Sequence, residues 1–400
     1  MSKSNETTPN VPTLRFAEYT DEWHKYALSD FVTRITRRNK NNESSLPLTI
    51  SAQYGLIDQI TFFNKTVASV DLSGYYLLYN GDFAYNKSYS NDYAWGAVKR
   101  LDKYEKGCLS SLYFVFRPTD KVDSDYLTHY FETSKWHKGI SDIAGEGARN
   151  HGLLNMAVDD YFATKHYLPS LSEQKKIACF LNLITKRIEI QNKIISKYET
   201  LIKRLGCDYF SKQPNHIAKL KDLIIKGKAG GTPSSTVAEY YNGDIPFLNI
   251  SDMTKQGKYV EFTEKYISEN GLANSSAWIV PSNSLILSMY ASVGLVCINK
   301  VPLATSQAMF SMVLKDCNML DYIYYYLNFF RETQIHRLLE TGTQSNINAD
   351  TVRDIEIPFY SNILAFVKML RAIENRLNNE KDMLSRLMDL KTYLLSSLFI

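Results

Sequence analysis

Hydrophobic residues recur at alternating steps of four and three along residues 170–205, which is the spacing of a heptad stripe on one long helix. Ser170 and Glu173 have the S-x-x-E spacing of a capping box, so the helix is expected to begin there. Gly206 and Pro214 are expected to end it. The stripe consists of Ile177, Leu181, Ile184, Ile188, Gln191, Ile195, Tyr198, Ile202 and Leu205.

The same stripe appears a second time 189 positions later, where Phe366 matches Ile177 and the other positions follow at the same offset. The polar residue at the centre recurs as well, since Glu380 matches Gln191. An offset kept along the whole stripe indicates one unit of about half the chain length that occurs twice. The second stripe consists of Phe366, Leu370, Ile373, Leu377, Glu380, Leu384, Leu387, Lys391 and Leu394.

The segment before each long helix has the pattern of a mixed α/β domain. Short runs of β-branched and aromatic residues, separated by Asn, Gly and Asp, predict strands joined by turns. Helices are expected at residues 125–140 and 319–339, where Asp125-Tyr126-Leu127 corresponds to Asp321-Tyr322-Ile323. The main predicted strands cover residues 46–51, 74–79, 83–90, 94–101, 109–118, 244–253, 284–299 (as a pair) and 304–314.

These elements predict an α/β (α+β) chain with an internal pseudo-two-fold repeat. The globular domains are expected at 1–168 and 214–358, and the long helices at 169–213 and 359–400. An amphipathic helix of about 35 residues, roughly 50 Å long, needs a partner for its stripe. The two helices are therefore expected to form an antiparallel coiled coil. Gln191 would face Glu380 and fix the register, unless both point to solvent at the edge of the stripe.

Composition excludes several classes of protein. The 400 residues are 44% hydrophobic, and no apolar run is long enough to cross a membrane. The polar start of the chain has no secretory signal, and the five cysteines form no C-x-x-C pair, so a cytoplasmic protein is expected. The net charge of +4 leaves the globular parts near neutral. Any binding to nucleic acid would depend on local basic patches and specific contacts.

The sequence contains no recognisable catalytic or cofactor motif. The glycine-rich stretch at residues 227–234 lacks the G-x4-G-K-[ST] order of a phosphate-binding loop. No N-P-P-[YF], H-E-x-x-H or G-x-S-x-G motif occurs, and the seven histidines are dispersed. These absences favour a chain that binds rather than catalyses.

The chain resembles the specificity (S) subunits of Type I restriction-modification systems. The segments that carry the resemblance are LPSLSEQKKIACFL (168–181), GGTPSSTVAEYYNGDIPFLNISDM (230–253), FAYNKSYSNDYAWGAVKRL (83–101), and the GARNHGLLN and GTQSNIN loops before each long helix. One departure is that residues 361–364 lack the Glu-Gln pair found at Glu173 and Gln174, which leaves the start of the second helix open.

The resemblance implies a subunit without catalysis of its own that reads double-stranded DNA. Each target recognition domain would read one half of a bipartite, asymmetric target, and the paired helices would act as spacer and dock. The implied partners are two methyltransferase (M) subunits and restriction (R) subunits of a phage-defence system. S-adenosylmethionine, ATP and Mg would bind to those partners, so no cofactor is expected on this chain.

Polar side chains in loops and at strand ends are the candidates for contact with DNA, because base edges are read by hydrogen bonds while most contacts reach phosphate and sugar. In the first unit the candidates are Asn86, Lys87, Ser88, Tyr89, Arg149, Asn150 and His151. In the second unit they are Thr232, Ser234, Tyr290, Ser292, Thr343, Gln344, Ser345 and Asn346. Each could instead be a turn-former or a polar residue at a strand edge.

Two other functions remain open at this stage. The chain could be a single-chain DNA methyltransferase or endonuclease, which would bind S-adenosylmethionine or cleave DNA by itself. It could also be a coiled-coil adaptor that never contacts DNA. The target bases and the length of the spacer between the half-sites cannot be inferred from the sequence.

Overall fold

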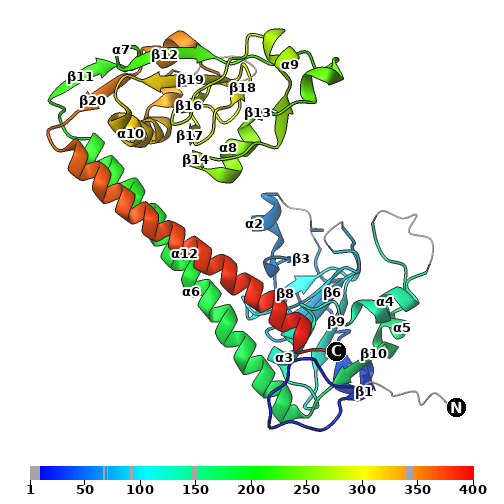
Figure 1. Cartoon of the computed structure of the whole chain (residues 1–400). Coiled ribbons are helices and arrows are strands. Elements are labelled where there is room, and N and C mark those ends of the chain that lie inside the picture. The colour runs from blue at the N-terminus through cyan, green and yellow to red at the C-terminus, as the bar shows by residue number, and fades with distance from the viewer. Residues whose placement is uncertain (1–9, 66–67, 70, 91–92, 146–151, 339–345) are drawn as a thin grey trace. The chain divides into compact units, whose positions relative to one another are not determined.

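The computed structural model describes residues 10–65, 68–69, 71–90, 93–145, 152–338 and 346–400 (Figure 1). The chain forms two compact units, of which one comprises residues 1–192 with 382–400 and the other residues 193–381. Each unit therefore contains a mixed α/β domain and one part of each long helix. In the described part of the chain, no helix has the length and apolar character needed to span a membrane.

The first unit is built around a four-stranded antiparallel sheet with strand order β2-β9-β6-β7. Its strands are β1 (His24–Ala27), β2 (Val32–Arg34), β3 (Leu48–Ser51), β4 (Gly55–Asp58), β5 (Tyr76–Tyr79), β6 (Phe83–Asn86), β7 (Ala97–Arg100), β8 (Lys106–Leu109), β9 (Phe114–Pro118) and β10 (Lys165–Leu168). Its short helices are α1 (Leu28–Phe31), α2 (Gln59–Phe63), α3 (Ser124–Tyr130), α4 (His137–Ile143) and α5 (Val158–Ala163). Strand β1 pairs with β10, so the first and last strands of the domain meet beside the long helix.

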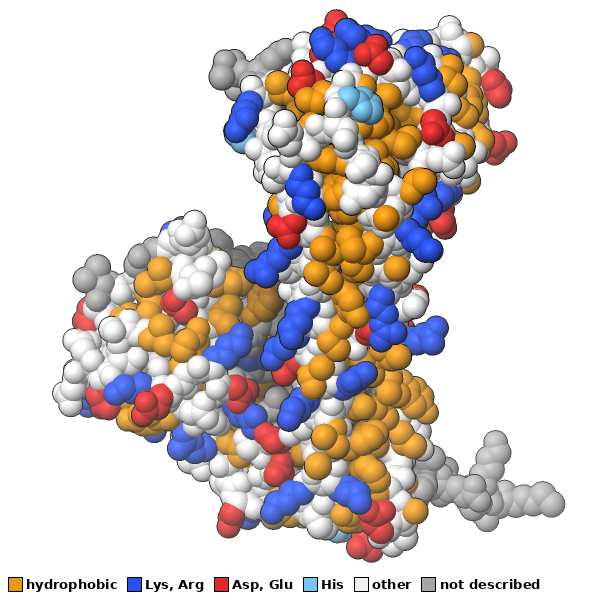
Figure 2. Space-filling model, turned by 90° about the vertical axis from the view of Figure 1, so that its left-hand side faces the viewer, with side chains coloured by type: hydrophobic (Ala, Val, Ile, Leu, Met, Phe, Trp, Pro, Cys, Tyr) orange, Lys and Arg blue, Asp and Glu red, His pale blue; other side chains and the backbone are white. Residues whose placement is uncertain are grey.

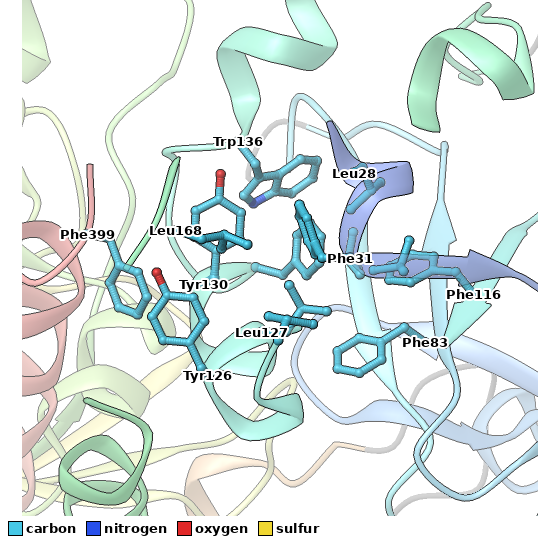
Figure 3. Close-up of a cluster of buried hydrophobic side chains, with 14 of the residues drawn as sticks. Leu28, Phe31, Phe83, Phe116, Tyr126, Leu127, Tyr130, Trp136, Leu168 and Phe399 are labelled. Carbon is cyan, nitrogen blue, oxygen red and sulfur yellow. The ribbon is translucent and has the colours of Figure 1, made fainter. Parts of the chain in front are cut away.

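An aromatic core joins this sheet to its helices. Phe83 and Phe116 stack with their ring centroids 5.6 Å apart, and Trp136 lies edge-on to Phe131 at 5.6 Å. Figure 3 shows that Phe399, from the end of the chain, lies beside Tyr126 in the same cluster. Because burying one large aromatic side chain contributes roughly 1.5–3 kcal/mol, this cluster holds the C-terminal helix against the domain.

The second unit repeats the plan of the first with additions. Its strands are β11 (His216–Lys219), β12 (Ile224–Ala229), β13 (Ile245–Leu248), β14 (Tyr259–Val260), β15 (Lys265–Ile267), β16 (Leu285–Ser288), β17 (Val296–Asn299), β18 (Ala304–Thr305), β19 (Met309–Leu314) and β20 (Glu356–Phe359). Its helices are α7 (Leu220–Leu223), α8 (Ile250–Gln256), α9 (Glu269–Ala273), α10 (Leu320–Thr333) and α11 (Ala349–Arg353), with the 3-10 turns η1 (Ala238–Tyr241), η2 (Cys317–Met319) and η3 (Ile335–Arg337).

The order of the strands confirms the internal repeat. The larger sheet of the second unit has the order β12-β19-β16-β17-β14, so its first four strands match β2-β9-β6-β7. The pair β11–β20 likewise matches β1–β10. Strand β14 has no counterpart in the first unit's sheet, and it pairs in parallel with β17.

The long helices are α6 (Leu171–Phe210) and α12 (Ile363–Ser397). All predicted stripe positions on both helices are buried or half-buried, and the first unit's core joins Ile177 and Leu181 of α6 to Leu394 of α12. In the second unit, Tyr209 of α6 stacks on Phe366 of α12 with the ring centroids 3.7 Å apart. The start of α6 thus meets the end of α12, and the end of α6 meets the start of α12, so the helices run antiparallel within each unit.

The predicted end of the first long helix is wrong, because α6 continues through Gly206 to Phe210. A glycine inside a helix costs only about 1 kcal/mol. Tyr209 and Phe210 lie beyond it, and both are buried against the aromatic cluster around Phe366 and Tyr322. Burial of these two rings outweighs the cost of the glycine.

The capping box is only half formed. Ser170 Oγ accepts a hydrogen bond from the Glu173 amide at 3.4 Å. The Glu173 carboxylate accepts two hydrogen bonds from Arg15, at 2.7 and 2.8 Å, instead of turning back to the cap. Gln174, also buried, accepts from the Asp123 amide at 2.8 Å and donates to the Pro169 carbonyl at 3.0 Å. The Glu-Gln pair therefore fastens the start of α6 to its domain.

A buried aspartate at the start of an equivalent helix connects each domain to a long helix. In the first unit, Asp125 of α3 accepts from Arg100 at 2.7 Å and from Asn182 of α6 at 2.8 Å. In the second unit, Asp321 of α10 pairs with Lys258 at 3.1 Å and with Arg371 of α12. Asn182 and Arg371 are 189 positions apart, which is the offset of the two stripes.

Two predicted elements are split in the structure. The helix expected at 125–140 is two helices, because the Thr133 hydroxyl donates to the Tyr130 carbonyl at 2.7 Å and a turn follows. The strand expected at 304–314 is β18 and β19, joined by a turn at residues 306–308.

Replacing His166 with glutamine is expected to flatten the pH dependence of stability. His166 is buried between the Tyr130 hydroxyl and the Thr164 hydroxyl, each 2.8 Å away, and burial lowers its pKa from 6.5 to about 4. The folded state resists protonation, so stability is complete above pH 6.5 and falls by about 3 kcal/mol as the pH drops toward 4. Urea unfolding at pH 7, 6, 5 and 4.5 measures this loss. An equal loss in wild type and H166Q would contradict it.

Candidate nucleic-acid interface

In the first unit, the predicted segment Asn86–Tyr89 continues β6 past the end of the sheet. The Leu154 amide donates to the Lys87 carbonyl at 3.0 Å, and the Tyr89 amide donates to the Gly152 carbonyl at 3.0 Å. Ser88 forms a bridge with Leu153 between these two bonds. The segment is thus held against residues 152–154. The predicted residues Arg149, Asn150 and His151 lie outside the described residues.

The four predicted side chains of this segment have different environments. Asn86 Oδ1 accepts from the Ser88 amide at 2.9 Å, so Asn86 shapes the turn. The Lys87 ammonium lies 4.8 Å from the Phe114 ring centroid, and burial lowers its pKa. Ser88 and Tyr89 are exposed, with Tyr89 39% accessible. The exposed pair is therefore the part of this segment best placed to meet a ligand.

In the second unit, two glycines hold the predicted loop at 232–234 tightly against the turn between β18 and β19. The Gly230 amide donates to the Met309 carbonyl at 3.0 Å, and the Gly231 amide donates to the Thr305 carbonyl at 2.9 Å. A Cβ on Gly230 would lie 2.1 Å from the Thr305 carbonyl oxygen. The GGTP motif is thus explained by a close backbone approach that only glycine permits.

The hairpin between β16 and β17 carries the predicted residues Tyr290 and Ser292. The Ser288 hydroxyl donates to the carbonyls of Tyr290 and Ala291, at 2.6 and 3.0 Å. Ala291 and Ser292 have φ values of 35° and 43°, which non-glycine residues rarely adopt. Strained backbone of this kind clusters at ligand sites, and here it presents an exposed tyrosine and serine.

The three predicted parts of the second unit come together at one place. The Met289 amide donates to the Ala308 carbonyl at 2.7 Å, and the Ile347 amide donates to the Met289 carbonyl at 3.1 Å. The glycine-rich loop, the hairpin and the segment after Asn346 therefore surround the turn at 306–308. Asn346 is half-buried beside this point. Thr343, Gln344 and Ser345 lie outside the described residues.

Sequence reasoning missed Gln307, which lies at the centre of this arrangement. Gln307 is exposed at the tip of the turn, and the Thr232 hydroxyl donates to its side-chain carbonyl oxygen. Its neighbours ATSQAMFSMVL were interpreted as one continuous strand, so nothing in the sequence marked a turn there. An amide with one end fixed by a hydroxyl is a rigid donor and acceptor pair of the kind that reads adenine.

The same backbone contact forms in both units. Residue 87 after β6 and residue 289 after β16 each accept one amide, from Leu154 and Ile347 respectively. Both donors lie shortly before the last helix and strand of their domain. The repeat thus places a strand exit and a returning loop together twice, with different side chains on them. As DNA contacts, the individual residues stay predictions.

The surroundings of the second site are mildly basic and polar. Lys226 and Lys228 are exposed on the edge strand β12, which leads into the glycine-rich loop. The Lys226 ammonium lies 4.1 Å from the Trp278 ring centroid. Among the described residues, no group of three or more His, Cys, Asp or Glu could hold a metal ion. Lysines beside neutral hydrogen-bonding groups suit a phosphate backbone with bases beside it.

The polar residues at the centres of the two stripes are buried. Gln191 is fully buried and Glu380 nearly so, which excludes the alternative that both point to solvent. Within the second unit, Arg376 pairs with Glu380 at 2.8 Å. That Gln191 faces Glu380 and sets the register stays a prediction.

A chain with two α/β domains of one strand order and an antiparallel helix pair has the architecture of a two-part reader. Residues 214–361 match the family described as the Type I restriction modification DNA specificity domain. The resemblance read from the sequence to the specificity subunits of Type I systems is therefore confirmed.

Curated relatives match part of the chain. The specificity subunit of the Type I restriction enzyme MjaIX from Methanocaldococcus jannaschii is 30% identical over 147 residues, 36% of this chain and 34% of the relative. That of HindI from Haemophilus influenzae is 31% identical over 180 residues, 43% of this chain and 38% of the relative. The matches thus span little more than a third of each relative's length.

Solved structures match nearly the whole fold. The Type I restriction-modification S subunit from M. genitalium gives a TM-score of 0.57 at 15% identity, and 98% of this chain and 99% of that chain are covered. A chain from a Type I restriction-modification system gives 0.59 at 16% identity, covering 94% and 97%. At these identities the likeness confirms the fold, including two α/β domains and two long helices.

Proposed function

We propose that this chain is the non-catalytic, DNA-reading specificity subunit of a Type I restriction-modification complex. The domains at 1–168 and 214–358 each read one half of a bipartite target. The observation that carries the proposal is the repeated arrangement at the ends of β6 and β16, which has one backbone plan and two sets of side chains. One scaffold with two different surfaces is what an asymmetric target requires.

The long helices act as spacer and dock. Within the first unit they expose Leu183, Ile190, Met388, Leu390 and Tyr393, and hydrophobic side chains are visible on the surface of the helices in Figure 2. A stripe of exposed apolar residues is typical of a surface that binds another protein. Two methyltransferase subunits and the restriction subunits bind the chain in the cytoplasm, and they hold S-adenosylmethionine, ATP and Mg.

Binding measurements separate this proposal from the alternatives. A complex of this chain with its methyltransferase partner binds a duplex carrying the methylated motif more tightly than a random duplex of equal length. Equal affinity for both duplexes at physiological salt would favour the adaptor without DNA binding. The purified chain alone neither binds S-adenosylmethionine nor cleaves DNA, and either activity would instead favour the single-chain enzyme.

Replacing Gln307 with alanine is expected to weaken binding to the target duplex by about 10- to 100-fold, which corresponds to one lost bidentate base contact of about 1–3 kcal/mol. Gln307 has this effect because its amide is fixed by Thr232 at the meeting point of three loops. Asn274→Ala is the matched control, since that amide donates to the Asn270 carbonyl at the end of α9. Equal binding by both variants would remove Gln307 from the interface.

A further inference from the structure

The outer edge of β7 is unpaired in the first unit. The Leu101 amide donates to the Asp82 carbonyl at 2.8 Å, and Lys99 lies opposite Ala84, so Lys99 and Leu101 turn their backbone groups toward β6. In an antiparallel strand the alternate residues face the other way. Val98 and Arg100 therefore face outward, and within the described ranges their outward N–H and C=O groups make no hydrogen bond.

The equivalent edge of the second unit is covered. Strand β17 corresponds to β7, and β14 lies along its outer side. The Ile298 amide donates to the Lys258 carbonyl and the Lys300 amide donates to the Val260 carbonyl, both at 2.7 Å. The repeat thus shows, in its own second copy, that this edge can accept one more strand.

A cleft of 540 Å³ lies beside the open edge of β7, entirely within the first unit. Val98 and Lys99 form one side of it, and Trp136 from the connection between α3 and α4 forms another. Residues Ile188 of α6 and Lys391 of α12 form the wall opposite the sheet. The cleft is therefore bounded by the strand edge, by a turn of the domain and by the paired helices.

The charges in this cleft favour a ligand with an acidic side chain. Lys391 is paired with Glu132 at 2.9 Å. Lys99 also lines the cleft, yet forms no ion pair with any residue in the described ranges. Two lysines and one glutamate leave one positive charge that a carboxylate would neutralise. Such a carboxylate would gain strength from the partly buried setting.

We infer that an extended segment of a methyltransferase subunit adds to β7 as a further strand, with an acidic side chain facing Lys99. The inference rests on the proposed function. The partner is the methyltransferase because the cleft wall is α12, on which Met388 and Tyr393 are exposed by 53% and 58%. Main-chain hydrogen bonds to a sheet edge give affinity, and the flanking pocket gives specificity.

The inference has an unsymmetrical consequence. The two methyltransferase copies have one sequence, but β14 already covers the equivalent edge in the second unit. Only the copy bound to the first unit can therefore form the added strand. The same segment of the other copy has no strand edge to bind.

Hydrogen–deuterium exchange tests this on the free chain and on its complex with methyltransferase subunits. The amides of Val98 and Arg100 are expected to exchange at least ten times more slowly in the complex, whereas those of Ile298 and Lys300 stay slow in both. In the methyltransferase, one segment shows two populations, protected and exchanging. A complex that assembles without protection of residues 96–101 would overturn the inference. Failure to assemble at all would instead count against the proposed function.

Val98→Pro separates strand addition from simple covering of the surface. Proline at this edge position removes only the outward N–H, and Val98→Ala is the control that loses similar side-chain packing while keeping that N–H. V98P is expected to bind methyltransferase about ten times more weakly than V98A. Equal binding by two folded variants would overturn strand addition, and the exchange experiment stands if V98P does not fold.

Discussion

Gly230→Ala is expected to abolish recognition of the half-site that the second domain reads. The new Cβ would lie 2.1 Å from the Thr305 carbonyl oxygen and 2.4 Å from that of Ser306, and both are backbone atoms. The glycine-rich loop must move away from the turn at 306–308, which separates Thr232 from Gln307. Binding of the complex to its target duplex is expected to fall by about 100-fold or more, the equivalent of one strong base contact or several weaker ones.

Gly206→Ala is the matched control for this variant. Gly206 lies inside α6 in the same unit, and a Cβ there would meet no atom within 4 Å. Alanine in a helix is about 1 kcal/mol more favourable than glycine, so this variant should bind DNA normally and be slightly more stable. Normal target binding by Gly230→Ala would contradict the interface described at the end of β12.

Lys258→Met is expected to destabilise the second unit by about 3–5 kcal/mol at pH 7. Lys258 is nearly buried between two carboxylates, with its ammonium 3.1 Å from Asp321 and 2.6 Å from Glu374. Methionine keeps the volume but leaves two partly buried carboxylates without this cation, although Arg371 still pairs with Asp321. Chemical denaturation of the free chain measures the change.

The effect of Lys258→Met should shrink in acid. Burial raises the pKa of Asp321, but the charges of Lys258 and Arg371 outweigh it and hold that pKa below its usual value. The stability from this pair is therefore present above the unfolded pKa near 4 and is lost as the pH falls below it. Lys203→Met, which removes an exposed partner of Glu332, is the control and should change little. A loss that is the same at pH 7 and pH 3.5 would contradict this account.

The helices and the repeat could be predicted from the sequence because both depend on regular spacing. The stripe from Ile177 to Leu205 follows the helical period, and a match 189 positions later needs no structure to detect. The strands at 83–90 and 284–299 were predicted for a similar reason, as short runs of β-branched and aromatic residues.

The remaining features depend on contacts between distant residues. Gly206 was expected to end α6, but the burial of Tyr209 and Phe210 from beyond it decides the outcome. Gln307 reaches the second site only because a turn divides β18 from β19. Strand β14, two residues long, is defined by its pairing with β17 rather than by its own composition. No periodic signal marks positions of this kind.

The most direct test of the two-reader account is an exchange of domains followed by mapping of methylated bases across a genome. Residues 1–168 are replaced by the corresponding domain of another specificity subunit, and the hybrid is expressed with the methyltransferase partner. The account predicts that one half of the methylated motif changes to that of the donor, while the other half and the spacer length stay as before. A motif that changes in both halves, or in neither, would contradict it.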